Sequence, residues 1–155
     1  YSTKNKIVQV FGIGSFIKNN IIKMLSDGSI EINNINGKFA LYGPKSQLKT
    51  NDVDIMAEKI KGKYININGN NEIENLIAED KSVANFKTNE IDMFALKAIY
   101  NKETNLIELF ENVKVIKDNE IILGDYAKIN TLNQSYKVTS QKTNKVKILI
   151  SDKNE

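Results

Sequence analysis

The chain of 155 residues contains no cysteine, histidine or tryptophan, and all of its 22 basic residues are lysine. The absence of cysteine excludes disulfide bonds, a thiol nucleophile and a thiolate metal site. The absence of histidine removes the commonest general base and a common metal ligand. Together with the weak carboxylate pairs described below, these missing residue types predict a protein that is not an enzyme and that holds no cofactor or metal ion, with an enzyme that uses carboxylates as the alternative.

Proline and long apolar runs are also scarce. The single proline, Pro44 in the segment YGPKS, indicates a turn or an edge position. No apolar run approaches the roughly 20 residues that a membrane-spanning helix needs, and no signal peptide is visible. Because the chain begins at Tyr1 rather than methionine, we expect a targeting segment upstream of it. The lack of cysteine does not decide the compartment, since a periplasmic protein needs no disulfide.

Charge is nearly balanced. The net charge is +3, and lysines alternate with acidic residues along most of the chain. This alternation predicts no continuous basic patch and disfavours a nucleic acid partner. Hydrophobic residues make up 41% of the sequence, enough for a core, and the length fits one domain over residues 1–155. Within it, residues 1–28 are either an N-terminal extension or the first strands.

Short apolar segments separated by polar turns dominate the chain between Asn89 and Ile150. The segments read EIDMFALKAIY, LIELFENVKVI, IILGDYAKI, YKVTS and VKILI. Their Ile, Val, Leu, Phe and Tyr content is typical of strands, and the Asn, Lys, Asp and Ser between them are typical of turns. Repeated strand–turn units predict an all-β fold whose sheet closes, stacks on another sheet, or leaves edges that must be used or protected.

The region before Asn89 has the same character with weaker signals. Alternation of Ile7, Gln9 and Phe11 suggests a strand, and Gly12 and Gly14 mark a bend. The segment NLIAEDKSVANF, residues 75–86, fits a short helix or two strands, and its Asn and Val content favours strands.

A faint internal repeat overlays VDIMAEKI, IDMFALKAIY and IILGDYAKI so that Ala57, Ala95 and Gly124 coincide. A small residue at each of these places suggests a tight spot where strands cross or bend. Chance similarity in a chain rich in Ile and Lys is the alternative.

Alternation along the strands predicts one apolar and one mixed face. The residues assigned to the apolar face of the two clearest strands are Phe94, Leu96, Ala98 and Tyr100, and Ile107, Leu109, Val113 and Val115. Lys97 lies on the opposite face of its strand. The apolar face belongs either to a packed sandwich core or to a groove that holds an acyl chain. Periodicity alone cannot separate these two interpretations.

Candidate catalytic groups are weak. Asp52 and Asp54 lie two residues apart, and Glu79 and Asp80 are adjacent, but both pairs occur in charge-rich segments typical of solvated turns. The segment GIGS lacks the downstream lysine of a phosphate loop, and no EF-hand ligand spacing is present.

One series of motifs carries a specific resemblance. In order, they are a small residue, an aromatic residue, a turn, L-x-G-N-V, a second turn and I-x-G-D. The matching residues are Ala95, Tyr100, Leu109, Asn112, Val113, Ile122, Gly124 and Asp125. The segment resembles the second half of the LptA (OstA-type) family, the periplasmic component of lipopolysaccharide transport. Glu111 replaces the glycine of G-N-V, and the first-half copy of that turn is not recognisable in residues 38–50.

The upstream part of the resemblance is thinner. SIEI, DIMAEKI and LIAEDKSVANFKT resemble early strands of the family, and Phe86 occupies the position of a family aromatic residue. The resemblance therefore covers residues 29–150, and residues 1–28 match nothing in the family.

The resemblance implies an open, twisted antiparallel β-jelly-roll of two sheets with an apolar, slit-like interior. It implies a periplasmic bridge protein that binds the acyl chains of lipopolysaccharide and passes it from the inner to the outer membrane. Matching positions assign Ile30, Ile32, Phe86 and Tyr100 to the lipid groove. The face pattern adds Phe94, Leu96, Ile107, Leu109, Val113 and Val115.

The resemblance also implies partners. Edge strands would pair with LptC-like and outer-membrane transporter domains and with further copies in a head-to-tail homo-oligomer. One alternative is an LptC-like component tethered to the inner membrane, which an uncleaved apolar span upstream would indicate. Another is a structural β-repeat interaction module with a dry interior.

Four lysines suggest a further contact. Lys18, Lys23, Lys45 and Lys49 are expected to flank the groove mouth and to meet lipid phosphates as point charges. Solvated surface lysines are the alternative.

Overall fold

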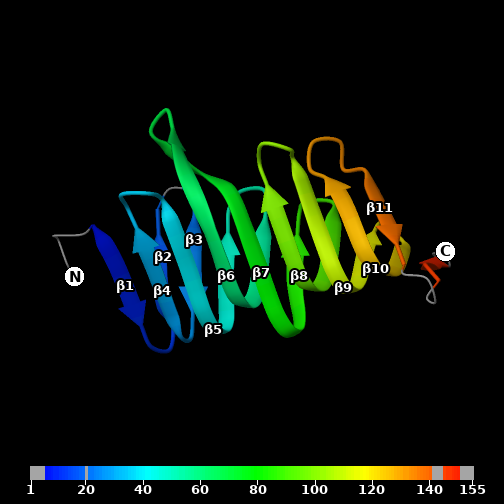
Figure 1. Ribbon diagram of the computed structural model, residues 1–155, viewed down its shortest axis with the longest axis horizontal. Coiled ribbons are helices and arrows are strands. Elements are labelled where there is room, and N and C mark those ends of the chain that lie inside the picture. Colours follow the sequence, from blue (N-terminus) through cyan, green and yellow to red (C-terminus); the bar gives the residue numbers. More distant parts are fainter. Residues whose placement is uncertain (1–5, 20, 141–144, 151–155) are drawn as a thin grey trace, which may run out of the picture.

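The computed structural model describes residues 6–19, 21–140 and 145–150, and every regular element in these ranges is a strand (Figure 1). The strands are β1 (Ile7–Phe11), β2 (Ser15–Lys18), β3 (Lys23–Ser26), β4 (Ser29–Asn33), β5 (Lys38–Lys49), β6 (Asp54–Ile67), β7 (Asn70–Lys87), β8 (Ile91–Asn101), β9 (Leu106–Lys117), β10 (Glu120–Asn130), β11 (Tyr136–Thr139) and β12 (Lys147–Ile150). In the described part of the chain, no helix is long and apolar enough to cross a membrane. The predicted all-β class is confirmed.

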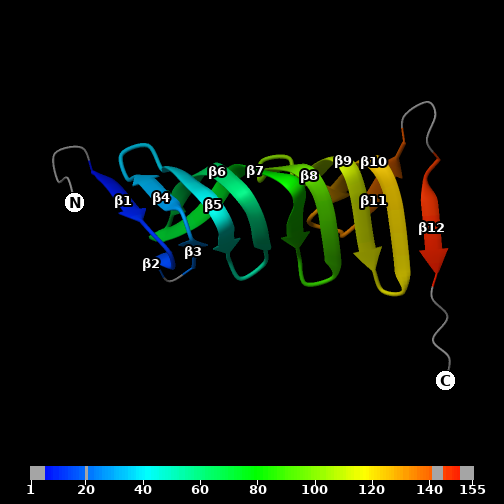
Figure 2. The same cartoon turned by 90° about the horizontal axis from the view of Figure 1, so that it is seen from below.

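All twelve strands belong to one antiparallel sheet with neighbours in nearly sequential order (Figure 2). β4 pairs with the first half of β5, and β3 pairs with its second half. In the same way, β11 and β12 pair with opposite halves of β10. β1 with β2, β3 with β4, and β11 with β12 therefore each act as one long strand broken at a corner.

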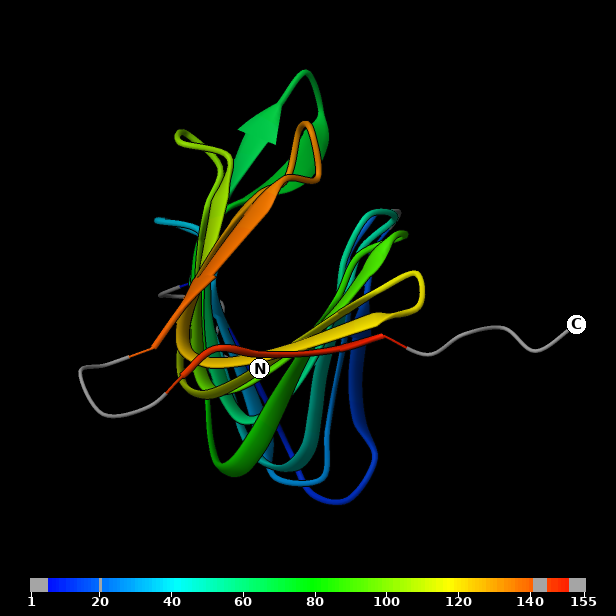
Figure 3. The same cartoon turned by 90° about the vertical axis from the view of Figure 1, so that its right-hand side faces the viewer.

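The long strands β5 to β10 all bend at one crease. The ladder loses register between Tyr42 and Ser46, Met56 and Lys59, Glu79 and Ala84, Phe94 and Lys97, Phe110 and Val113, and Gly124 and Tyr126. Such bulges bend a strand and increase its local twist. The result is one sheet folded into two walls that diverge from the crease (Figure 3). This is the predicted open jelly-roll, with two continuous walls in place of two separate sheets.

The two walls are defined by their strand segments. The first wall contains β1, β4, β11 and residues 38–42, 59–67, 70–79, 97–101, 106–110 and 126–130. The second wall contains β2, β3, β12 and residues 46–49, 54–56, 84–87, 91–94, 113–117 and 120–123.

Backbone conformation explains how the crease forms. Glu111 and Asn112 have φ of 65° and 54°, in the left-handed region where glycine is at no disadvantage. Glu111 and Asn112 therefore turn the chain at the crease in β9. Gly43, with φ of 108°, and Lys45, with φ of 54°, make the corresponding corner in β5. Positive-φ residues therefore turn the chain at the crease in both β5 and β9.

The small residues of the internal repeat all lie at this crease. Ala57 is 6% exposed and Ala95 is 2% exposed. A Cβ atom at Gly124 would lie 2.5 Å from Cγ1 of Val138 and 2.7 Å from the Thr139 carbonyl oxygen. The structure thus places all three residues at the tight corner that the repeat predicts.

The core occupies the space between the walls, and both walls contribute to it. The largest fully buried side chains are Phe86, Ile30, Leu41, Leu48, Ile55, Ile60, Leu76, Ile91, Met93, Ile107, Leu109 and Ile129. Burial of each such side chain is worth about 1.5–3 kcal/mol. The facing apolar sides of the two walls therefore hold the folded sheet together.

Two uncertain segments are strands. β1 to β3 incorporate residues 7–11, 15–18 and 23–26 into the sheet, so the first-strand interpretation of this region is correct. β7 runs through the whole segment that also fitted a helix, so the helical alternative is wrong.

Candidate functional site

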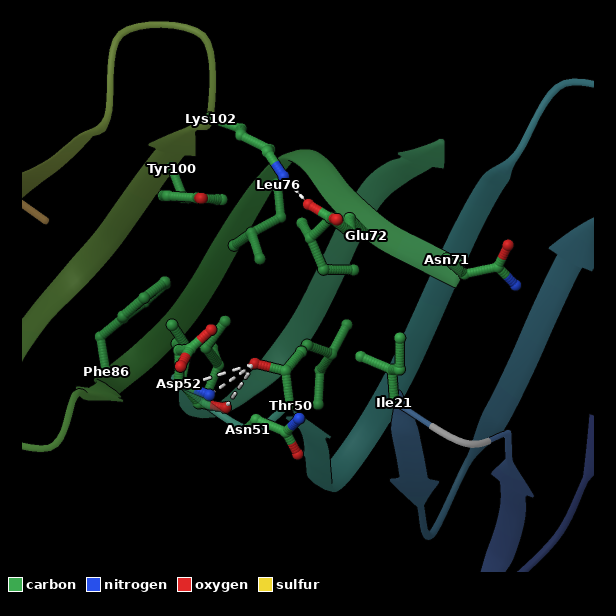
Figure 4. Close-up of a pocket in the computed structure, with 14 residues that line it drawn as sticks. Ile21, Thr50, Asn51, Asp52, Asn71, Glu72, Leu76, Phe86, Tyr100 and Lys102 are labelled. Atoms are coloured by element: carbon green, nitrogen blue, oxygen red, sulfur yellow. Dashed lines mark hydrogen bonds and ion pairs between the residues drawn. The ribbon is translucent and has the colours of Figure 1, made fainter. Parts of the chain in front are cut away.

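A cavity of about 300 Å³ opens between the walls, beyond the packed core (Figure 4). Its floor is apolar and comes from both walls. Leu48, Ile55 and Phe86 belong to the second wall, and Leu76 and Tyr100 belong to the first. The interior is therefore a slit with an apolar bottom that remains open along part of its length.

The rim of this cavity is polar. Asp52 lies in the turn between β5 and β6, where the Thr50 hydroxyl oxygen accepts the N–H groups of Asp52 and Val53 at 3.3 and 3.1 Å. On the opposite rim, the Glu72 carboxylate pairs with the Lys102 ammonium group. These two features place charged groups on both sides of the opening.

Tyr100 lies between the apolar floor and the polar rim. Burial raises the pKa of its phenol, and the nearby Asp52 carboxylate raises it further. The side chain packs against the core, so it presents a ring to the slit and a hydroxyl group toward the rim.

A second cavity, of about 280 Å³, continues the slit toward the N-terminal end of the sheet. Ile17, Met24 and Ile32 line it. Tyr64 also lines this cavity and donates a hydrogen bond from its hydroxyl to Oδ1 of Asn34 at 2.8 Å. Burial raises the pKa of Tyr64. The apolar space therefore spans several strands.

A two-stranded ribbon of β6 and β7 overhangs both cavities. Residues 64–67 pair with residues 70–73 beyond the last pairs with β5 and β8, and Figure 1 shows this hairpin projecting past its neighbours. Asn71 from this ribbon lines both cavities, and Ile73 lines the larger one. The ribbon therefore forms one lip of the slit.

Toward the C-terminal end, polar contacts join the two walls over the slit. The Lys117 ammonium donates to the Gln134 carbonyl at 3.2 Å, and the Thr88 hydroxyl donates to Oε1 of Gln134 at 3.4 Å. The Tyr136 hydroxyl donates to the Glu120 carboxylate at 3.1 Å. Burial raises the pKa of Tyr136, and this hydrogen bond raises it further. This group of contacts, which we call the latch, bridges the slit opposite its open end.

The structure brings together several residues predicted from the sequence. Phe86 and Tyr100 line the larger cavity, and Ile32 lines the second. Ile30, Ile107, Leu109, Val113 and Val115 are buried in the core, with at most 2% of each side chain exposed. They form the bottom of the slit between the walls.

The predicted inward orientation of Phe94 and Leu96 is wrong. The bulge between Phe94 and Lys97 adds one position to the alternation, so Met93 and Ala95 point inward and the next inward residue is Ala98. Phe94 is half-buried outside the core, with Nζ of Lys114 5.4 Å from its ring centroid. Leu96 lies in the bulge, half-buried and outside the core.

Sequence reasoning missed Leu48, Ile55 and Leu76 as floor residues. Alternation in the segments QLK and VDI marks Leu48 and Ile55 as inward-facing, and this signal could have identified them. The pairing of the two walls, which brings Leu76 opposite them, has no local signal.

The paired acidic residues form no catalytic constellation. Asp54 accepts a hydrogen bond from Gln47 at 2.6 Å and pairs with Lys49 at 3.4 Å, away from Asp52. Glu79 pairs with Lys59 at 2.9 Å, which lowers the pKa of its carboxyl. Among the residues that the structure describes, no cluster of three acidic side chains could hold a metal ion.

The four lysines do not lie together. Lys45 lies at the crease and pairs with Asp27 at 3.1 Å, so its predicted place at the mouth is wrong. Lys18, Lys23 and Lys49 are cross-strand neighbours near the rim of the second wall. Each follows or precedes an inward-facing residue, so they point to the outer face.

The two ends of the sheet have open edges. Within the described ranges, β1 pairs only with β4 and β2 only with β3. At the other end, β11 and β12 pair with β10 and with no other described strand. All four residues of β12 are exposed, including Ile148 at 58% and Ile150 at 68%. Among the described residues, the sheet therefore has an unpaired strand edge at each end (Figure 2).

The fold is shared with a protein of known structure. LptH from Pseudomonas aeruginosa, described as the LptA homologous periplasmic component of the conserved lipopolysaccharide transport device, superposes with a TM-score of 0.69. The alignment covers 84% of this chain and 95% of that chain at 15% identity. No family model and no curated protein sequence matches the chain. The resemblance to LptA-type proteins is confirmed at the level of the fold.

Proposed function

We propose that this chain is a periplasmic, non-enzymatic transport protein that binds lipopolysaccharide and passes it from the inner to the outer membrane. The observation that carries the proposal is the apolar slit, which is open to solvent at a polar rim. Acyl chains need apolar area and no specific polar chemistry, at about 0.8 kcal/mol for each buried methylene. The fold that the chain shares with LptH supports this assignment.

The two open edges suit a bridge of several modules. An exposed strand edge can accept a strand from another chain, with main-chain hydrogen bonds supplying affinity. β1 and β12 lie at opposite ends of the sheet, so both can be used at once. We propose head-to-tail pairing with further copies and with LptC-like and outer-membrane transporter domains.

Site-specific photocrosslinking to lipopolysaccharide tests the slit. A photoreactive residue at Tyr100 or Val53, which both contact the core near the rim, should form adducts. The matched control is Lys97, which pairs with Glu79 on the outer face. Adducts at the first two positions alone support lipid in the slit. Absence of adducts from the folded protein would instead favour the structural interaction module.

An LptC-like component remains the second candidate within the same pathway. It shares the predicted fold and lipid and differs in having a membrane anchor. The sequence upstream in the gene decides between the two. A cleavable signal supports the LptA-like role, and an uncleaved apolar span supports the LptC-like role.

A further inference from the structure

We propose that the rim of the larger cavity binds the sugar part of an amphiphile's head group, through its hydroxyl and amine groups, and excludes phosphate. The rim consists of the turn formed by residues 50–53 on one side and of Asn71, Glu72 and Lys102 on the other. This inference rests on the proposed function, because it places the acyl tail on the apolar floor. It adds the chemical class of the head group and the residues that select it.

The charged groups of the rim favour an amine over a phosphate. Asp52, Glu72 and Lys102 are the charged residues that line the cavity. Glu72 and Lys102 neutralise each other in an ion pair. Within the described part of the chain, the Asp52 carboxylate has no ion pair. The rim therefore has a net negative charge, although the whole chain carries a net charge of +3.

The lysines near the mouth do not offset this charge. Lys49 points to the outer face and pairs with Asp54 at 3.4 Å. Lys18 and Lys23 also point outward from β2 and β3. Among the described residues, no unpaired cation lines the rim beside the Asp52 carboxylate, so a phosphate there would meet a like charge, and like charges at short range repel. An ammonium group there would be attracted.

The rim also offers hydrogen-bonding groups that suit the hydroxyl groups of a sugar. Asn51 and Asn71 each offer a carbonyl acceptor and an amide donor at the rim, and the Asp52 carboxylate accepts. The Tyr100 hydroxyl has no hydrogen-bond partner among the described residues. Mixed donors and acceptors above an apolar floor suit a sugar with an attached apolar chain.

Calorimetric titration with three amphiphiles that share a dodecyl chain tests the proposal. We expect dodecylammonium to bind tightest, dodecyl glucoside next and dodecyl phosphate weakest. The affinities of dodecylammonium and dodecyl phosphate should differ by about five-fold, which is the upper end of the effect of one exposed ion pair. Non-specific attraction to a chain of net charge +3 would produce the opposite order, so the order itself is diagnostic.

Two variants and a control assign the effect to the rim. Asp52→Asn should remove the preference for dodecylammonium over dodecyl glucoside. Glu72→Gln releases Lys102 and should raise the affinity of dodecyl phosphate several-fold. Glu111→Gln removes one exposed carboxylate at the crease, far from the rim, and should leave the order unchanged.

The outcomes separate this inference from the proposed function. Equal binding of all three amphiphiles, tightest binding of the phosphate, no binding, or an order insensitive to Asp52→Asn each overturns it. If lipopolysaccharide crosslinks at Tyr100 but the three amphiphiles bind without selection, the proposed function is supported and the rim inference is wrong. Asp52-dependent selection without crosslinking would support the rim site and remove lipopolysaccharide as its ligand.

Discussion

At the scale of single residues, the absence of a side chain at Gly124 allows two strands to approach closely. A Cβ atom there would lie 2.5 Å from Cγ1 of Val138 and 2.7 Å from a backbone oxygen. We expect Gly124→Ala to lower the free energy of unfolding by about 2–3 kcal/mol, the upper part of the range for overpacking, because one of the two close atoms belongs to the backbone. Urea denaturation measures the change.

Gly69→Ala provides the matched comparison. Gly69 has φ of +85° at the tip of the β6–β7 hairpin, and nothing lies within 4 Å of its added Cβ atom. Its substitution should cost only the left-handed strain, about 1 kcal/mol. Similar costs for the two variants would contradict the steric explanation of Gly124.

Asp80 stabilises the corner of β7 through its carboxylate. Oδ2 accepts the Glu58 N–H at 2.9 Å, and Oδ1 accepts the Ser82 and Val83 N–H groups at 2.9 and 3.1 Å. Burial raises the pKa of this carboxyl, but the hydrogen bonds together lower it below 3.8. The corner is therefore most stable when Asp80 is ionised.

The pH dependence follows from the direction of this shift. A carboxyl with a lower pKa in the folded state adds stability above its unfolded pKa and loses it as pH falls through the folded value. Asp80→Asn should cost about 1 kcal/mol at pH 7 and should flatten the loss of stability below about pH 4. Denaturation at a series of pH values measures both. A parallel fall for parent and variant would exclude this role, and Asp118→Asn in an exposed turn is the control.

At the scale of elements, the latch divides the slit into a closed and an open part. We expect the double variant Gln134→Ala and Tyr136→Phe to speed amide hydrogen exchange in residues 131–136, because it removes two of the three latch contacts, those from Thr88 to Gln134 and from Tyr136 to Glu120. Global stability should change by less than about 2 kcal/mol. Hydrogen-exchange mass spectrometry makes the measurement.

Tyr126→Phe is the control for the latch. The Tyr126 hydroxyl bonds to Glu108 within the first wall, and burial together with this carboxylate raises its pKa to about 12. Its loss leaves the wall-to-wall contacts in place, so exchange in residues 131–136 should not change. Equal acceleration in both variants would mean that the latch contacts do not hold the walls together.

At the scale of the whole molecule, the unpaired edges are the surfaces through which we propose that copies associate. β12 exposes Ile148 and Ile150 at 58% and 68% on a strand with one free edge. We expect Ile148→Lys with Ile150→Lys to weaken self-association by at least ten-fold, because edge lysines oppose strand addition. Sedimentation velocity over a range of concentrations measures this.

Leu132→Lys is the matched control for the edge. Leu132 is 75% exposed in the turn between β10 and β11, so Leu132→Lys replaces an exposed apolar side chain outside β12. Its association should match that of the parent chain. Equal weakening by both changes would point to general hydrophobic association in place of edge pairing.

The sequence alone determined the all-β class, most strand positions and the apolar character of one face. Local composition and alternation encode these features, as the inward Ile107, Leu109, Val113 and Val115 demonstrate. Tertiary structure decided where each alternation changes phase. The bulge after Phe94 reverses the inward face, and although the repeat marks Ala95 as a bend, it does not show that the alternation changes phase there. Asp52, Glu72 and Lys102 line one rim although they are far apart in the sequence. Only the folding of the two walls against each other brings these segments to the same cavity.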